Sequence, residues 1–125
     1  MPRLAAVGPP RLLAGLDETA WMDRTAHLAV HGPAPGLSTG ELAELADDIG
    51  LRGRGGAGFP FARKLRAVAD ALGRKGTGGA VVVNGSEGEP GCLKDTALLL
   101  YVPHLVLDGA LLAARRSART KWWSG

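Results

Sequence analysis

The sequence predicts an α/β protein, an incomplete three-layer fragment with glycine-rich loops at a ligand site. Three observations carry this prediction. Apolar residues recur with helical spacing in several segments, one short run is β-branched, and 19 of the 125 residues are glycine. Twelve of these glycines lie between Gly50 and Gly91, without a repeating period. Glycine-rich loops are places where a backbone comes close to a ligand or turns with positive φ.

The clearest predicted helix spans residues 39–49. Ser38 stands three residues before Glu41, which is the pattern of a capping box, and Gly50 is placed to end the helix. Its apolar face is formed by Leu42, Leu45, Ala46 and Ile49. This segment begins the predicted domain.

A second helix, a buried strand and two further helices follow. Pro60 opens the second helix, which Gly73 is expected to end. The continuous run Ala80–Val83 is typical of a buried strand. A short helix is predicted around residues 96–100, and a last one from Pro103 through Ala114.

Three segments result. Residues 1–36 form an irregular lead-in, residues 37–114 form a partial α/β domain, and residues 115–125 form a basic, divergent tail. The net charge of +3 depends on that tail. The other basic cluster lies between Arg52 and Lys75 and favours a small anionic ligand. Nucleic acid is disfavoured, because single-strand binding uses interleaved aromatic residues and these are few.

Several function classes are excluded by composition. The single cysteine, Cys92, leaves no internal disulfide and no cysteine-ligated metal built from this chain alone. The histidines, His27, His31 and His104, lack metal-type spacing, and His104 is expected on the surface at a helix start. No apolar stretch reaches the ~18–20 residues of a membrane span, and no signal peptide is recognisable. We therefore expect a cytoplasmic protein.

The first loop contains Gly53-x-Gly55-x-x-Gly58, which matches a dinucleotide-binding pattern by letter. That pattern must follow a strand, whereas here a helix precedes it. What remains is bare backbone before a helix N-terminus, where free N–H groups and the helix dipole attract an anion. Arg54 and Lys64 can add charge. The alternative is a flexible surface loop with a solvated arginine.

The second loop, Asn84–Gly91, follows the predicted strand. Ligands in open α/β sheets lie at the carboxyl ends of strands. Asn84 is placed to bond a ligand edge. Glu87 and Glu89 could serve acid–base chemistry, a divalent cation or ribose hydroxyls, and the alternative is a solvated acidic turn.

Together, three motifs resemble a known family. They are GLRGRGGAGFP at 50–60, VVVNGSEGEPG at 81–91 with Lys94-Asp95 after it, and PHLVLDGA at 103–110. In this order they resemble the N-terminal, FMN-binding part of the flavoprotein subunit of respiratory complex I. The same module occurs in NAD-reducing hydrogenases and NAD-dependent formate dehydrogenases. The resemblance covers residues 37–114.

The resemblance implies an NADH dehydrogenase-type function. Hydride would pass from NADH to FMN, and electrons would pass on to an iron–sulfur cluster that the family carries on sequence absent here. An iron–sulfur partner subunit is implied as well, with no direct membrane insertion. The implied cofactor-binding residues are Gly53, Arg54, Gly55, Gly56, Phe59, Lys64, Asn84, Ser86, Glu87 and Glu89. No residue is assigned a catalytic or metal-binding role.

The sequence also departs from the family pattern. Phe61–Leu65 replaces the usual Thr-Gly-x-Lys-Trp, Gly85-Ser86-Glu87 replaces Ala-Asp-Glu, and residues past Ala114 are not expected to match. These differences indicate a divergent, truncated relative. We expect this chain alone to bind FMN weakly or not at all and not to oxidise NADH. The alternatives are an inactive remnant and an anion-binding module that needs a partner chain.

Overall fold

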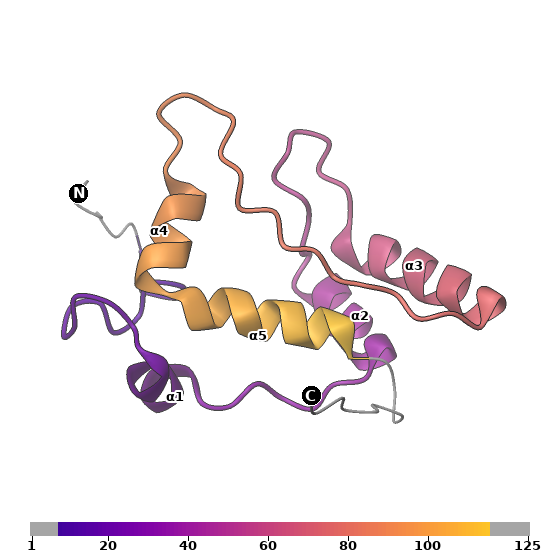
Figure 1. Ribbon diagram of the computed structural model, residues 1–125, viewed down its shortest axis with the longest axis horizontal. Coiled ribbons are helices and arrows are strands. Elements are labelled where there is room, and N and C mark those ends of the chain that lie inside the picture. The colour runs from indigo at the N-terminus through magenta and orange to yellow at the C-terminus, as the bar shows by residue number, and fades with distance from the viewer. Residues whose placement is uncertain (1–7, 116–125) are drawn as a thin grey trace. The chain divides into compact units, whose positions relative to one another are not determined.

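A computed structural model describes residues 8–115. Five helices follow one another along this part of the chain (Figure 1): α1 (Arg24–His31), α2 (Thr39–Asp48), α3 (Phe61–Lys75), α4 (Lys94–Tyr101) and α5 (Pro103–Ala114). No strand forms among these residues, and their only β-type pairing is one antiparallel bridge between Arg52 and Pro60. The described chain divides into two units, 8–34 with 83–109 and 35–82 with 110–115, so the division falls inside α5.

The unit that contains α1 and α4 is built around two buried side chains, Met22 and Val102. The amide of Met22 donates a hydrogen bond to the carbonyl of Tyr101 at 2.7 Å. α1 starts where it does because the carboxylate of Asp23 accepts from the backbone N–H of Ala26 at 2.8 Å. The predicted irregular lead-in thus contains a capped helix that the sequence reasoning missed.

All three histidines of the chain gather in this unit. His27 is only 2% exposed, and its Nε2 lies 2.7 Å from Oδ2 of Asp108 on α5. The rings of His31 and His104 lie 5.2 and 5.6 Å from the His27 ring. His104, expected on the surface, is therefore half-buried in a cluster. The expectation was wrong because the segment that covers it, α1, was not foreseen.

The second unit confirms the capping box. The Ser38 hydroxyl accepts from the amide of Glu41, and the Glu41 carboxylate accepts from the amide of Ser38 at 2.7 Å. These bonds hold the pKa of Glu41 below its ordinary value. α2 ends at Asp48, one residue before the predicted end, with Ile49 as its C-cap, and Gly50 follows with φ of 64°. The start and end of α2 thus follow the local signals, but its predicted apolar face is wrong. Ala43 and Ala46 are buried, whereas Leu45 and Ile49 are exposed.

α3 packs against α2 through small side chains. The buried cluster consists of Ala43, Ala46 and Ala62, with Phe61 and Leu65 packed against it. Alanines allow the two helices to approach closely, and Arg66 pairs with Asp47 at 2.5 Å outside the cluster. α3 runs past Gly73, the predicted end, and stops at Gly76, which adopts the left-handed conformation.

The segment 80–83 forms no strand in the described chain. Val82 is 86% exposed, contrary to the predicted burial. A strand exists only when a neighbour fills its hydrogen bonds, and no described segment pairs with this one. The prediction of a buried strand is wrong for this part of the chain, and the α/β fold class stays a prediction.

The last two helices lie close to their predicted positions. α4 begins at Lys94, two residues before the predicted start, and α5 has the predicted bounds. No single helix in the described part of the chain is long and apolar enough to cross a membrane. α4 and α5 together have the required length and apolar composition, but the chain bends by 97° between them.

Candidate functional site

The glycine-rich loop between α2 and α3 is closed at its base by backbone hydrogen bonds. The amide of Gly53 donates to the carbonyl of Phe59 at 2.9 Å. The amide of Phe61 donates to the carbonyl of Leu51 at 3.0 Å. The antiparallel bridge lies between these two bonds, so the loop is a small hairpin that leads directly into α3.

The glycines of this loop differ in whether their backbone conformation requires glycine. Gly56 and Gly58 adopt φ of 93° and 60°, which other residues rarely reach. Gly55 has no positive φ, and a Cβ added there would meet nothing within 4 Å. Neither the turn nor packing within the described chain requires glycine at position 55. The open space beside its backbone is therefore available to a ligand.

Arg52 is a part of this loop that sequence reasoning did not single out. Its guanidinium donates to the carbonyl of Gly58 at 3.0 Å. The bond spans the base of the loop and adds a side-chain clamp to the backbone bonds. The sequence did contain a signal for this residue, because an arginine directly precedes the glycine motif. Its hydrogen-bond partner, the carbonyl of Gly58, becomes evident only in the closed hairpin.

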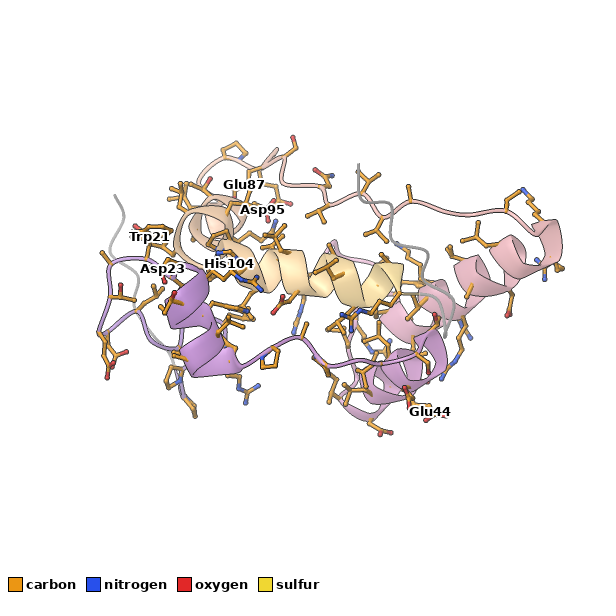
Figure 2. All side chains as sticks on the ribbon, turned by 60° about the horizontal axis from the view of Figure 1, so that its bottom comes forward. Trp21, Asp23, Glu44, Glu87, Asp95 and His104 are labelled. Carbon is orange, nitrogen blue, oxygen red and sulfur yellow. The ribbon has the colours of Figure 1, made fainter. Side chains whose placement is uncertain are left out.

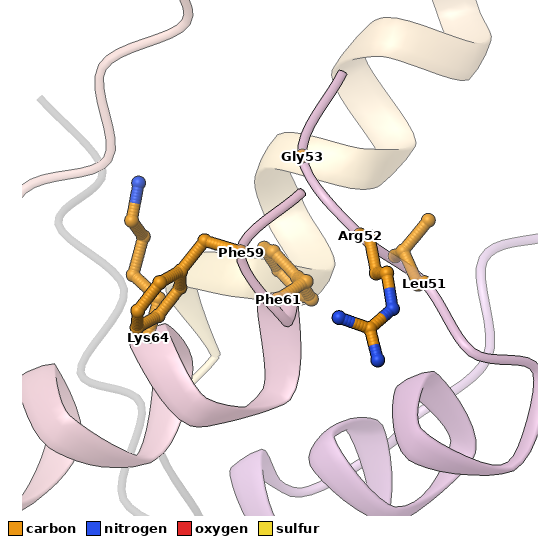
Figure 3. A pocket seen from close by; sticks show the side chains of 6 residues that line it. All are labelled: Leu51, Arg52, Gly53, Phe59, Phe61 and Lys64. Atoms are coloured by element: carbon orange, nitrogen blue, oxygen red, sulfur yellow. The ribbon is translucent and has the colours of Figure 1, made fainter. Parts of the chain in front are cut away.

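A cavity of about 210 Å³ lies at the base of the loop (Figure 3). Its lining contains three predicted site residues, Gly53, Phe59 and Lys64. The other lining residues, Leu51, Arg52 and Phe61, were not predicted. Two cations and two aromatic rings therefore surround one cavity, which suits a ligand with an anionic end and an apolar part. Arg54, Gly55 and Gly56 are exposed in the same loop and do not line this cavity.

The first turn of α3 has no side-chain cap. Pro60 precedes the helix and provides no side-chain cap, so the N–H groups of the first turn are not all taken up. Lys64 lies at the end of that turn, and Arg63 stands 5.9 Å from the centre of the Phe59 ring. Uncapped helix N-termini with nearby cations are a recurrent class of site for phosphorylated ligands.

The second loop is organised by its own side chains. Oδ1 of Asn84 accepts from the amide of Ser86 at 2.9 Å. One carboxylate oxygen of Glu87 accepts from the amide of Asp95 at 2.6 Å, and the other accepts from the hydroxyl of Thr96 at 2.6 Å. Figure 2 shows Glu87 beside Asp95. Two of the predicted ligand-binding side chains thus make hydrogen bonds within their own unit.

These contacts set the electrostatics of the second loop. The hydrogen bond from Thr96, with those from the helix backbone, holds the pKa of Glu87 below its ordinary value. The hydrogen bond with Asp95 raises the pKa of Lys94. Glu89 is exposed, and no described residue donates to its carboxylate. Between residues 8 and 115, no three His, Cys, Asp or Glu side chains are grouped to hold a metal ion.

The predicted site residues therefore fall into two groups. Gly53, Phe59 and Lys64 come together in one unit, and Asn84, Ser86 and Glu87 come together in the other. That both loops contact the same ligand stays a prediction.

Comparison with known proteins identifies the family. Residues 46–123, more than half of the chain, match the family model described as the Nuo51 FMN-binding domain. The chain belongs to this family. The match extends past Ala114, where the sequence predicted no resemblance, into residues that lie mostly outside the described part of the chain.

The relatives are components of NADH dehydrogenases. The chain is 39% identical over 79 residues to an NADH-quinone oxidoreductase subunit of Mycobacterium bovis, covering 59% of this chain and 17% of that one. It is 44% identical over 64 residues to the mitochondrial NADH dehydrogenase [ubiquinone] flavoprotein 1 of Dictyostelium discoideum, covering 51% and 13%. An NADH-quinone oxidoreductase subunit of Rhodobacter capsulatus is 42% identical over 72 residues, covering 58% and 16%. The chain thus spans about a sixth of the length of these relatives. No solved structure matches it.

Proposed function

We propose that this chain provides FMN-binding loops of an NADH dehydrogenase-like flavoprotein. FMN would supply the chemistry of accepting a hydride from NADH and passing electrons singly to an iron–sulfur cluster. The observation that carries the proposal is the closed glycine-rich loop, with its cavity and cations, inside the segment that matches the FMN-binding family. The relatives' names support NADH as the substrate and other subunits as partners.

The residues present fit the two chemical ends of FMN. Lys64 and the uncapped amides of α3 suit the phosphate, because a dianion is stabilised by charge-assisted hydrogen bonds and by the helix dipole. The open backbone at Gly55, flanked by the exposed Arg54, gives room for the ribityl chain or ring to approach. Phe59 would supply an apolar wall.

In the second loop, we propose that Asn84, Ser86 and Glu89 provide polar contacts to the flavin or to NADH. The Glu89 carboxylate is exposed and accepts no hydrogen bond from a described residue. A carboxylate of this kind can accept hydrogen bonds from ribose hydroxyls. The chain offers no residue to which we assign a catalytic step.

The cavity size supports weak binding by this chain alone. About 210 Å³ is smaller than the ~300–1,000 Å³ typical of small-molecule sites. It accommodates one end of FMN rather than the whole molecule. We therefore expect weak FMN binding by this chain and no NADH oxidation.

A flavin titration tests the proposal. Quenching of FMN fluorescence by the 125-residue chain should saturate, and Lys64→Ala should weaken binding about tenfold, as expected for a charge-assisted hydrogen bond. Lys75→Ala is the matched control, because Lys75 lies in the last turn of the same helix. The absence of saturable binding, or equal weakening by both variants, would contradict the proposal.

A second candidate is an anion-binding module that a partner chain completes. The observation that favours it is exposed apolar surface, with Ile49 67% and Val82 86% exposed. Competition with inorganic phosphate separates the two candidates. A module that recognises only the anion would bind phosphate as tightly as FMN, whereas a flavin site would prefer FMN by a large factor.

A further inference from the structure

The start of α4 is capped by a residue from outside the helix. The residue at its N-cap position, Leu93, has no side-chain oxygen to accept from the first-turn amides. Such amides need a partner, since the first four N–H groups of a helix lack one within the helix. Glu87, eight residues before Asp95, provides that partner through one carboxylate oxygen at 2.6 Å.

The same carboxylate makes a second bond, so both of its oxygens are occupied. Oε2 accepts from the hydroxyl of Thr96 at 2.6 Å. A negative charge at this position also favours the positive end of the helix dipole. The side chain of Glu87 is half-buried, while the residues on either side of it are exposed. Within its own unit, Glu87 is therefore directed at the helix.

A separate contact fixes the same loop to the same helix. A Cβ added at Gly85 would come within 3.0 Å of Cδ1 of Leu99, so the backbone of the loop passes close to α4. The loop thus meets α4 at its first turn through Glu87 and further along the helix through Gly85. Directly before Gly85, Oδ1 of Asn84 accepts from the amide of Ser86.

We propose that Glu87 is a positioning residue, which fixes the Asn84–Gly91 loop on the N-terminus of α4 through Asp95 and Thr96. The carboxylate of Glu87 is then occupied by its hydrogen bonds to the helix. Ser86 and Glu89 are the side chains of this loop that remain available to bind a ligand. The ligand-binding consequence rests on the proposed FMN function. The positioning itself is a property of the chain without ligand.

Hydrogen exchange at the amide of Asp95 tests the positioning directly. In the ligand-free 125-residue chain, Glu87→Ala removes the bond to the Asp95 amide and should speed exchange there by about three- to tenfold. Thr96→Val removes only the bond that holds the Glu87 carboxylate in place and should speed exchange at Asp95 by less. Thr96→Val in the Glu87→Ala background should add almost nothing, because the partner is already gone. Glu89→Gln is the control, since it removes a charge from the same loop without removing a bond to α4.

FMN binding distinguishes this role from direct ligand contact. If Glu87 positions the loop, Thr96→Val weakens FMN binding in the same direction as Glu87→Ala but by a smaller factor, and the double variant is no weaker than Glu87→Ala. If Glu87 contacts the ligand, Thr96→Val leaves FMN affinity unchanged, and the proposal is wrong. Unchanged exchange at Asp95 in Glu87→Ala would also overturn it. If the parent chain binds no FMN, the proposed function fails, and exchange at Asp95 still decides whether Glu87 holds the loop.

Discussion

The two glycine-rich loops of this chain keep their shapes by different means. The first loop is closed by bonds between backbone atoms and by one arginine clamp, from Arg52 to Gly58. The second loop is held by side-chain oxygens, those of Asn84 and Glu87. The first therefore depends on backbone conformations that only glycine readily adopts, and the second depends on a titratable group.

The two loops should therefore respond differently to pH. The positive φ values of the first loop do not change with pH, whereas the cap made by Glu87 requires an ionised carboxylate. Substitution of a glycine should consequently affect the first loop most, and a change of pH should affect the second loop most.

Gly58→Ala should have the largest effect on stability. Its φ of 60° costs a residue with a Cβ about 1–2 kcal/mol, and its carbonyl is the acceptor of the Arg52 clamp. We expect the free energy of unfolding to fall by that amount, measured by urea denaturation. A Gly58→Ala chain as stable as the parent would show that the hairpin does not hold the loop.

Gly55→Ala should instead lower the affinity for FMN without lowering stability. An added Cβ meets nothing within the described chain, so the free energy of unfolding should stay within ~0.5 kcal/mol. FMN affinity should fall severalfold, because the methyl group occupies space that we assign to the cofactor. FMN fluorescence titration measures this. Unchanged affinity would place the ligand away from Gly55.

Acidification should loosen only the second loop. The pKa of Glu87 is lowered from its ordinary 4.5 in the folded chain, so the stabilisation by its cap is present above that value and is lost as pH falls through the folded pKa. The side-chain carboxyl carbon resonance of Glu87 should therefore titrate with a midpoint below 4.5, while the amide resonance of Gly53 stays in place. In Glu87→Gln this titration should disappear, and its persistence would assign the shift to another group.

Arg63→Gln should have the smallest effect. Its guanidinium stands 5.9 Å from the Phe59 ring at an exposed site, where a cation–π contact contributes roughly 0.5–1 kcal/mol at most. We expect FMN affinity to change less than about threefold. A loss as large as that of Lys64→Ala would mean that Arg63 contacts the phosphate itself.

The sequence predicted those parts of the fold whose signals are local. The capping box at Ser38 and Glu41 and the bounds of α5 depend on neighbouring residues, and both are confirmed. α1 was missed because it is short and its buried face is completed by Asp108, far along the chain. The segment 80–83 is β-branched, but β-branching provides no pairing partner.

In the candidate site, too, the sequence predicted local features but not contacts between distant residues. Motif spacing and charge singled out Gly53 and Lys64, the family resemblance added Phe59, and all three line one cavity. They could not show that Glu87 reaches a helix eight residues away or that Arg52 bonds across its loop. Both contacts depend on how the chain turns between the partners, and periodicity carries no information about that.

The proposal requires FMN to bind at the glycine-rich loop between α2 and α3. A titration of the isotope-labelled 125-residue chain with FMN, followed by the amide resonances of Gly55 and Gly76, examines this loop itself, since Gly76 lies at the other end of α3. We predict that the Gly55 resonance shifts and saturates while the Gly76 resonance stays in place. If Gly55 stays in place, or if both resonances shift equally, FMN does not bind at this loop.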